Sequence, residues 1–177
     1  MIDPDLLTRC IIDSTSEVFS TMLDLEVQFT GFASDAKTAD AGLISLVGIT
    51  GEWGGSGVFC CSPALASTIC ARMLGNEADP DNPVINEEVL DVVAEVTNMM
   101  IGNVKNGLEA ATGPLAISVP TVIHGRNFQF RNSGSAHGVA LSFTAGEESF
   151  EVRVALSPTA ERGGGRPRIP VLGLAHI

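Results

Sequence analysis

The longest helical pattern in this sequence runs from about Asn86 to Ala111, and it is strongly two-sided. Glu87 and Glu88 suit the positive end of the helix dipole, and Gly113-Pro114 predicts its end. At about 100° per residue, the apolar side chains gather on one side. Such a stripe has to be buried against another layer of secondary structure. The core-facing residues are Val89, Val92, Val93, Val96 and Met100.

Shorter patterns on both sides of this helix predict the layer on which it packs. One helix is expected to start at Asp3-Pro4, and a short one to run from Ser62-Pro63 to Gly75. The resulting order is α-β-β-β-α-α-β-β-β with hairpin-type connections. This order predicts an α+β layered domain with a largely antiparallel sheet packed by long helices. The strand-like runs are residues 25–30, 42–50, 57–62, 115–125, 138–146 and 149–157.

Residues 1–157 are therefore predicted to form one domain, and the Gly/Pro-rich residues 158–177 a flexible C-terminal tail. A tight turn within GEWGGS, residues 51–56, is expected to join two strands as a hairpin. Trp53 in this turn has two readings, as a partner contact or as an aromatic side chain folded onto the core.

Charge and composition exclude several classes of function. A formal net charge of −11 disfavours nucleic acid and anionic membranes as partners. No apolar run reaches the length of a membrane span, and the N-terminus lacks the basic start of a signal peptide, so the cytoplasm is expected. The four cysteines and three histidines do not cluster, which predicts no metal site. A hydrophobic content of 45% favours a buried subunit interface, hence a homodimer.

The polar side of the long helix carries the candidate functional residues. Asp91, Glu95, Asn98, Gly102 and Lys105 fall within a sector of roughly 80°. A solvated surface is the ordinary reading of such a stripe, and Lys105 is read equally well as a docking charge or as a solvated residue. Asn98 and Gly102 fit that reading poorly, because both disfavour helix and the glycine costs about 1 kcal/mol relative to alanine. This side of the helix is therefore predicted to dock a partner.

The spacing Asp91-xxx-Glu95-xx-Asn98 resembles the [DS]xxxExxN signature of the CheC/CheX/FliY chemotaxis phosphatases. In that family a proline follows some twenty residues later, and Pro120 stands here one residue nearer than usual. Residues 42–75, a glycine-bounded hairpin followed by a short helix ending in MLG, also resemble the family. The likeness covers about residues 5–156. The helix predicted at residues 4–23 carries no second ExxN, a pattern similar to CheX rather than CheC.

The resemblance implies a CheX-like phosphatase that hydrolyses the aspartyl phosphate of a CheY-like response regulator. By this resemblance Glu95 would contact the regulator's active-site lysine, and Asn98 would hold the attacking water in line with phosphorus. Asp91, Gly102 and Lys105 would contribute to partner binding. The Mg²⁺ ion would belong to the regulator, so the chain would need no cofactor of its own. The resemblance to CheX-like proteins also implies that this chain forms a homodimer.

Two other classes of function stay open on the sequence. A domain of this fold could bind a receiver domain or a flagellar-switch component without hydrolysing anything. The intact pair of Glu95 and Asn98 argues against such a scaffold, which would not need it. A small-molecule-binding domain would need a concave polar cluster, and the sequence displays none.

Overall fold

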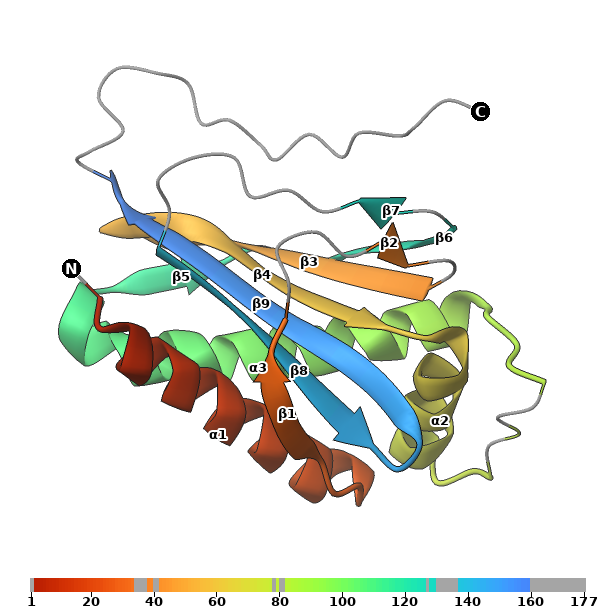
Figure 1. Cartoon of the computed structure of the whole chain (residues 1–177). Helices are drawn as coiled ribbons and strands as arrows, with labels where there is room; N and C mark the ends of the chain where they lie inside the picture. Colours follow the sequence, from red (N-terminus) through yellow and green to blue (C-terminus); the bar gives the residue numbers. More distant parts are fainter. Residues whose placement is uncertain are drawn as a thin grey trace.

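A computed structural model describes residues 2–33, 38–39, 42–77, 79, 82–126, 128–129 and 137–159, with three helices and nine strands in these ranges (Figure 1). The helices are α1 (Pro4–Leu23), α2 (Pro63–Leu74) and α3 (Glu87–Thr112). The strands are β1 (Gln28–Phe32), β2 (Thr38–Ala39), β3 (Gly42–Gly51), β4 (Trp53–Cys61), β5 (Leu115–Ile117), β6 (Thr121–Gly125), β7 (Phe128–Gln129), β8 (His137–Ala145) and β9 (Glu148–Pro158).

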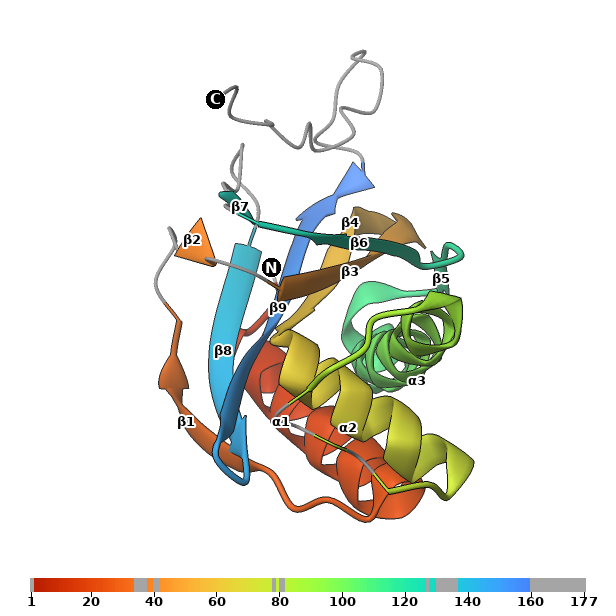
Figure 2. The ribbon, with the colours of Figure 1, turned by 90° about the vertical axis from the view of Figure 1, so that its right-hand side faces the viewer.

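Seven of these strands form one antiparallel sheet in the order β1-β8-β9-β4-β3-β5, with β6 also paired to β3. The short strands β2 and β7 pair separately. Figure 2 shows the three helices together on one side of this sheet. The predicted α+β class, the antiparallel sheet and the order of elements are confirmed.

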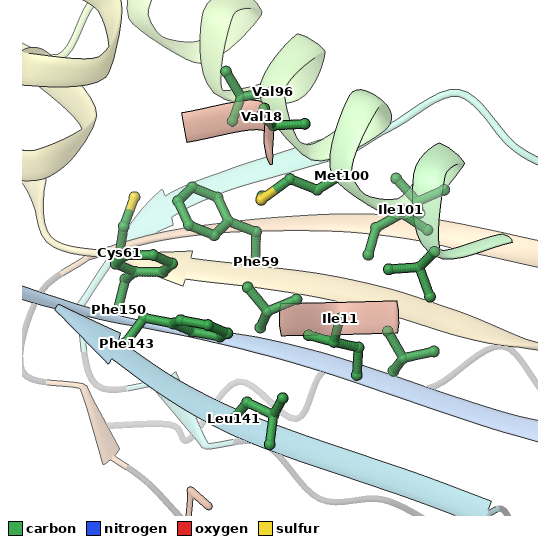
Figure 3. Close-up of a cluster of buried hydrophobic side chains, with 14 of the residues drawn as sticks. Ile11, Val18, Phe59, Cys61, Val96, Met100, Ile101, Leu141, Phe143 and Phe150 are labelled. Carbon is green, nitrogen blue, oxygen red and sulfur yellow. The ribbon is translucent and has the colours of Figure 1, made fainter. Parts of the chain in front are cut away.

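The core lies between the sheet and the helices (Figure 3). Phe19 of α1 stacks on Phe150 of β9 at 4.9 Å between ring centroids, and Phe143 of β8 stacks on Phe150 at 5.3 Å. Phe59 of β4 meets Phe150 edge-on. All four rings are almost completely buried. Rings packed in this way stabilise a core by about 0.5–1.5 kcal/mol per pair beyond the area they bury.

Helix α3 begins and ends where the sequence predicts. The Asn86 side chain accepts a hydrogen bond from the Val89 amide at 3.0 Å, which satisfies one of the free amides of the first turn. At the other end, Gly113 has a φ of 77°, a conformation that favours glycine. The predicted core-facing residues are buried apart from Val92, which is half-buried. The polar side of α3 therefore faces away from the core.

The first predicted strand and the hairpin differ from the structure in detail. Strand β1 begins at Gln28 rather than Leu25 and is largely exposed, because it is the end strand of the described sheet. In the hairpin, β4 already begins at Trp53, so most of GEWGGS is strand and Glu52 alone separates β3 from β4. Trp53 is buried with only 9% of its surface exposed, so the core reading of this residue is confirmed.

The run 115–125, predicted as one strand, is interrupted at Ser118–Pro120. Strand β5 pairs with one end of β3, and β6 pairs with the other. Leu46 pairs with Thr121, and Ile49 pairs with Ile117. Moving three positions along β3 therefore corresponds to moving four positions along the segment that joins β5 to β6. The extra residue makes a β-bulge, and Pro120 adds to the interruption because it has no amide hydrogen for the ladder.

Strand β9 extends to Pro158, and the Thr159 amide donates to the Glu52 carbonyl at 2.9 Å. Residues 160–177, most of the predicted tail, lie outside the described residues, so the flexible tail stays a prediction. None of the helices described is both long enough and apolar enough to cross a membrane.

Candidate functional site

An open groove of about 450 Å³ runs beside the N-terminal half of α3 and is called the α3 groove here. One wall is helix α3, and the other is the interrupted segment between β5 and β6. The groove brings together Pro120 and the three signature residues, although some twenty residues separate Asn98 from Pro120 in the chain. Its lining residues are Asp91, Ala94, Glu95, Asn98, Ile117, Ser118, Val119 and Pro120.

The α3 wall carries two carboxylates and one amide. Asp91 and Glu95 are exposed and Asn98 is half-buried. None of these three side chains forms a hydrogen bond or an ion pair with another described residue. Like charges four residues apart on a helix destabilise it by about 0.2–0.5 kcal/mol, so the Asp91–Glu95 arrangement carries a small cost. The described residues that line the groove include no basic side chain to offset that charge.

This arrangement suits a cationic group better than an anion. Two exposed carboxylates create a negative potential at the groove, and it would favour a lysine or arginine side chain of an incoming partner. The Asn98 amide lies beside them and offers both a donor and an acceptor. A group of three acidic, histidine or cysteine residues suitable for a metal ion was not found in the described ranges.

Gly102 and Lys105 lie further along α3 and do not line the groove. A Cβ at Gly102 would meet only Ile117 Cδ1 at 3.7 Å, an ordinary contact. Packing within the described chain therefore does not require glycine at this position. The Lys105 ammonium contacts the Glu109 carboxylate at 2.7 Å, so its charge is already engaged on its own helix.

Glu109 is held by two donors. The Lys105 ammonium donates a hydrogen bond to its carboxylate, and the Leu115 amide donates another at 3.3 Å. Both interactions favour the charged form and lower the pKa of Glu109 below its ordinary value. This contact also ties the end of α3 to the start of β5, the strand that leads into the second wall of the groove.

The second wall of the groove was not predicted from the sequence. Pro120 was identified only through the family resemblance, and neither Ser118 nor Val119 was predicted to belong to the site. A signal was present in the sequence, since a proline within an otherwise strand-like run predicts an interrupted strand. The pairing of both flanks with β3, however, depends on contacts between residues 64 to 83 positions apart, from Gly51 with Leu115 to Gly42 with Gly125.

The fold is shared with chemotaxis proteins of known structure. The chain resembles CheX from Vibrio vulnificus with a TM-score of 0.73 and 24% identity, covering 85% of this chain and 99% of that one. It also resembles CheX in the CheX–CheY–BeF₃–Mg²⁺ complex from Borrelia burgdorferi, with a TM-score of 0.67, 24% identity and coverage of 88% and 99%. The chain therefore has the fold of CheX.

The sequence comparisons define the family. The family profile of the chemotaxis phosphatase CheX matches residues 43–144. CheY-P phosphatase CheX from Thermotoga maritima is 25% identical over 152 residues, which cover 85% of this chain and 95% of the relative. This chain belongs to the CheX family of chemotaxis phosphatases, as its signature on α3 predicts.

Proposed function

We propose that this chain hydrolyses the aspartyl phosphate of a CheY-like response regulator. The observation that carries the proposal is the row of Asp91, Glu95 and Asn98 on the exposed side of α3, which faces a groove and has no side-chain partner among the described residues. A relative from Thermotoga maritima named CheY-P phosphatase CheX and the Borrelia burgdorferi complex of CheX with CheY support the choice of partner.

In this proposal Glu95 pairs with the active-site lysine of the regulator and orients α3 over the phosphorylated aspartate. The Asn98 amide enters the regulator's site and holds a water molecule in line with phosphorus. The water oxygen then bonds to phosphorus, and the bond from phosphorus to the aspartyl oxygen breaks. Inorganic phosphate and a free carboxylate result.

An amide can serve this purpose without being a strong base. Phosphoryl transfer through a loose transition state depends mainly on positioning and charge neutralisation, and a glutamine orients water in GTPases. The Mg²⁺ ion is supplied by the regulator in this proposal, in keeping with the Mg²⁺ present in the Borrelia complex. The chain itself binds the regulator through Glu95 and aligns the attacking water through Asn98.

The test is phosphate release from a Mg²⁺-bound, phosphorylated receiver domain. Asn98→Ala should lower kcat and kcat/KM together by about a hundredfold or more, because the amide acts mainly in the transition state. Asn103→Ala is the matched control, since Asn103 lies on the same helix and its amide contacts Glu17 of α1 at 3.4 Å. Full activity in Asn98→Ala would exclude this role of Asn98, whereas binding without phosphate release by the wild-type protein would favour a non-catalytic interaction module.

We also propose that the protein acts as a cytoplasmic homodimer joined through sheet edges. Strand β1 ends the described sheet and exposes Phe29 and Phe32, with 41% and 72% of their surfaces accessible. An open edge with apolar side chains invites pairing with a second chain. Light scattering at micromolar concentration should give twice the mass of one chain, and a monomer mass would contradict the proposal.

A further inference from the structure

Val119 projects from the second wall of the α3 groove with 85% of its surface exposed. It is the most exposed large hydrophobic residue of the described chain. A lone exposed valine on a flat surface needs no explanation. Val119 differs because it stands at the bulge between β5 and β6, beside the carboxylates and the amide of α3.

Three hydrogen bonds of Ser118 hold this wall in place. The Ser118 amide donates to the Gly48 carbonyl at 2.8 Å, and the Gly48 amide donates to Ser118 Oγ at 2.9 Å. The hydroxyl in turn donates to the Val119 carbonyl at 3.0 Å. Ser118 thereby replaces the backbone pairing that the bulge interrupts, and the backbone at Val119 is fixed before any partner arrives.

The second wall of the groove lies close to β3 at Gly48 and Ser118. A Cβ at Gly48 would lie 3.3 Å from Ser118 Oγ and 3.6 Å from its Cβ. Bulges commonly re-aim a side chain next to a functional site. Here the bulge directs an apolar side chain outward at the rim of a groove whose other wall is acidic.

We propose that Val119 is a docking residue for the receiver domain and that Ser118 is the positioning residue that presents it. This proposal rests on the proposed function. Its chemistry requires a partner surface on which a lysine, to pair with Glu95, lies beside an apolar patch, to cover Val119. A preformed apolar contact adds affinity at little entropic cost, because the backbone carrying it is already ordered.

The first experiment measures binding separately from turnover. The probe is a receiver domain with Mg²⁺ and beryllium trifluoride, titrated against wild type and Val119→Ser. The Kd should rise about tenfold, the effect expected for losing one buried valine contact. In steady-state phosphate release, KM should rise similarly while kcat falls far less than in Asn98→Ala.

Val84→Ser is the matched control. Val84 has 66% of its surface exposed, lies before α3 and does not line the groove, so its replacement should leave Kd unchanged. Both variants should melt like wild type because each residue is exposed. An unchanged Kd in Val119→Ser, with Asn98→Ala still inactive, would overturn this inference and leave the proposed function standing. No binding of the receiver domain by wild type would overturn both.

The second experiment addresses Ser118. Ser118→Ala removes the hydroxyl that bridges Gly48 and Val119, so the Kd should rise several-fold. Ser118→Thr keeps a hydroxyl and should restore affinity. A Kd that stays at the wild-type value in Ser118→Ala would overturn the positioning role of Ser118.

Discussion

Ile101 of α3 packs directly over Gly57 of β4, and a Cβ at position 57 would lie 2.5 Å from Ile101 Cδ1. Ile101 is completely buried at this contact. The absence of a side chain on β4 lets α3 approach the sheet closely, and it helps to set the rotation of the helix about its axis. The contact therefore helps to determine the direction in which the side chains of Asp91, Glu95 and Asn98 point.

Gly57→Ala should destabilise the protein by about 1–3 kcal/mol, because an added methyl group overpacks a well-filled core. Denaturant unfolding monitored by circular dichroism measures the change. Shortening the facing side chain in the double variant with Ile101→Val should recover part of the loss, since the two residues are in direct contact. An unaltered midpoint in Gly57→Ala would show that Ile101 moves aside without cost.

Gly102→Ala should have the opposite effect on stability. The new Cβ would make only an ordinary contact with Ile117, so the helix should gain up to about 1 kcal/mol. If the partner's backbone approaches α3 here, the same change should weaken binding to the receiver domain. A more stable variant with unchanged Kd and turnover would remove Gly102 from the docking surface.

Glu95→Gln should weaken binding while leaving the fold intact. The substitution keeps the shape of the side chain and removes its charge, and it relieves the repulsion from Asp91 on the same side of α3. We expect a higher Kd for the receiver domain and a shallower dependence of Kd on salt. Glu147→Gln, in the exposed turn between β8 and β9, is the control and should bind normally. Wild-type affinity and salt dependence in Glu95→Gln would exclude the lysine contact.

Lys105→Met should raise the pKa of Glu109 toward its ordinary value, because the largest influence lowering it is the hydrogen bond from Lys105. A carboxyl with a depressed pKa contributes stability above the ordinary glutamate value of about 4.3, and this contribution is lost as pH falls through the folded-state pKa. The variant should therefore lose stability near neutral pH, and it should lose less in acid, where Glu109 is protonated in both the folded and the unfolded chain. Carbon NMR titration of the Glu109 carboxyl measures the pKa directly.

The same titration tests the docking role of Lys105. The Lys105 ammonium has to give up its ion pair with Glu109 in order to form one with a partner. A docking role predicts that adding the receiver domain to wild type raises the pKa of Glu109, because Lys105 then leaves it. An unchanged pKa in the complex would identify Lys105 as a residue that only supports the end of α3.

Local patterns in the sequence were sufficient for the helices and for one wall of the site. The apolar stripe of α3, its cap at Asn86 and its end at Gly113 depend on residues within a few positions of one another. The spacing of Asp91, Glu95 and Asn98 places them on one side of any regular helix. These features could be predicted because helix geometry is periodic and its capping is local.

Tertiary contacts alone decided the other wall. Nothing near Ser118 in the chain shows that its hydroxyl meets Gly48, 70 residues away, or that β5 and β6 pair with the two ends of β3. The bulge, the α3 groove and the outward position of Val119 all follow from that long-range pairing. The register between distant strands is selected by the packing of the whole sheet. The wall of the α3 groove between β5 and β6 could therefore be identified only from the folded chain.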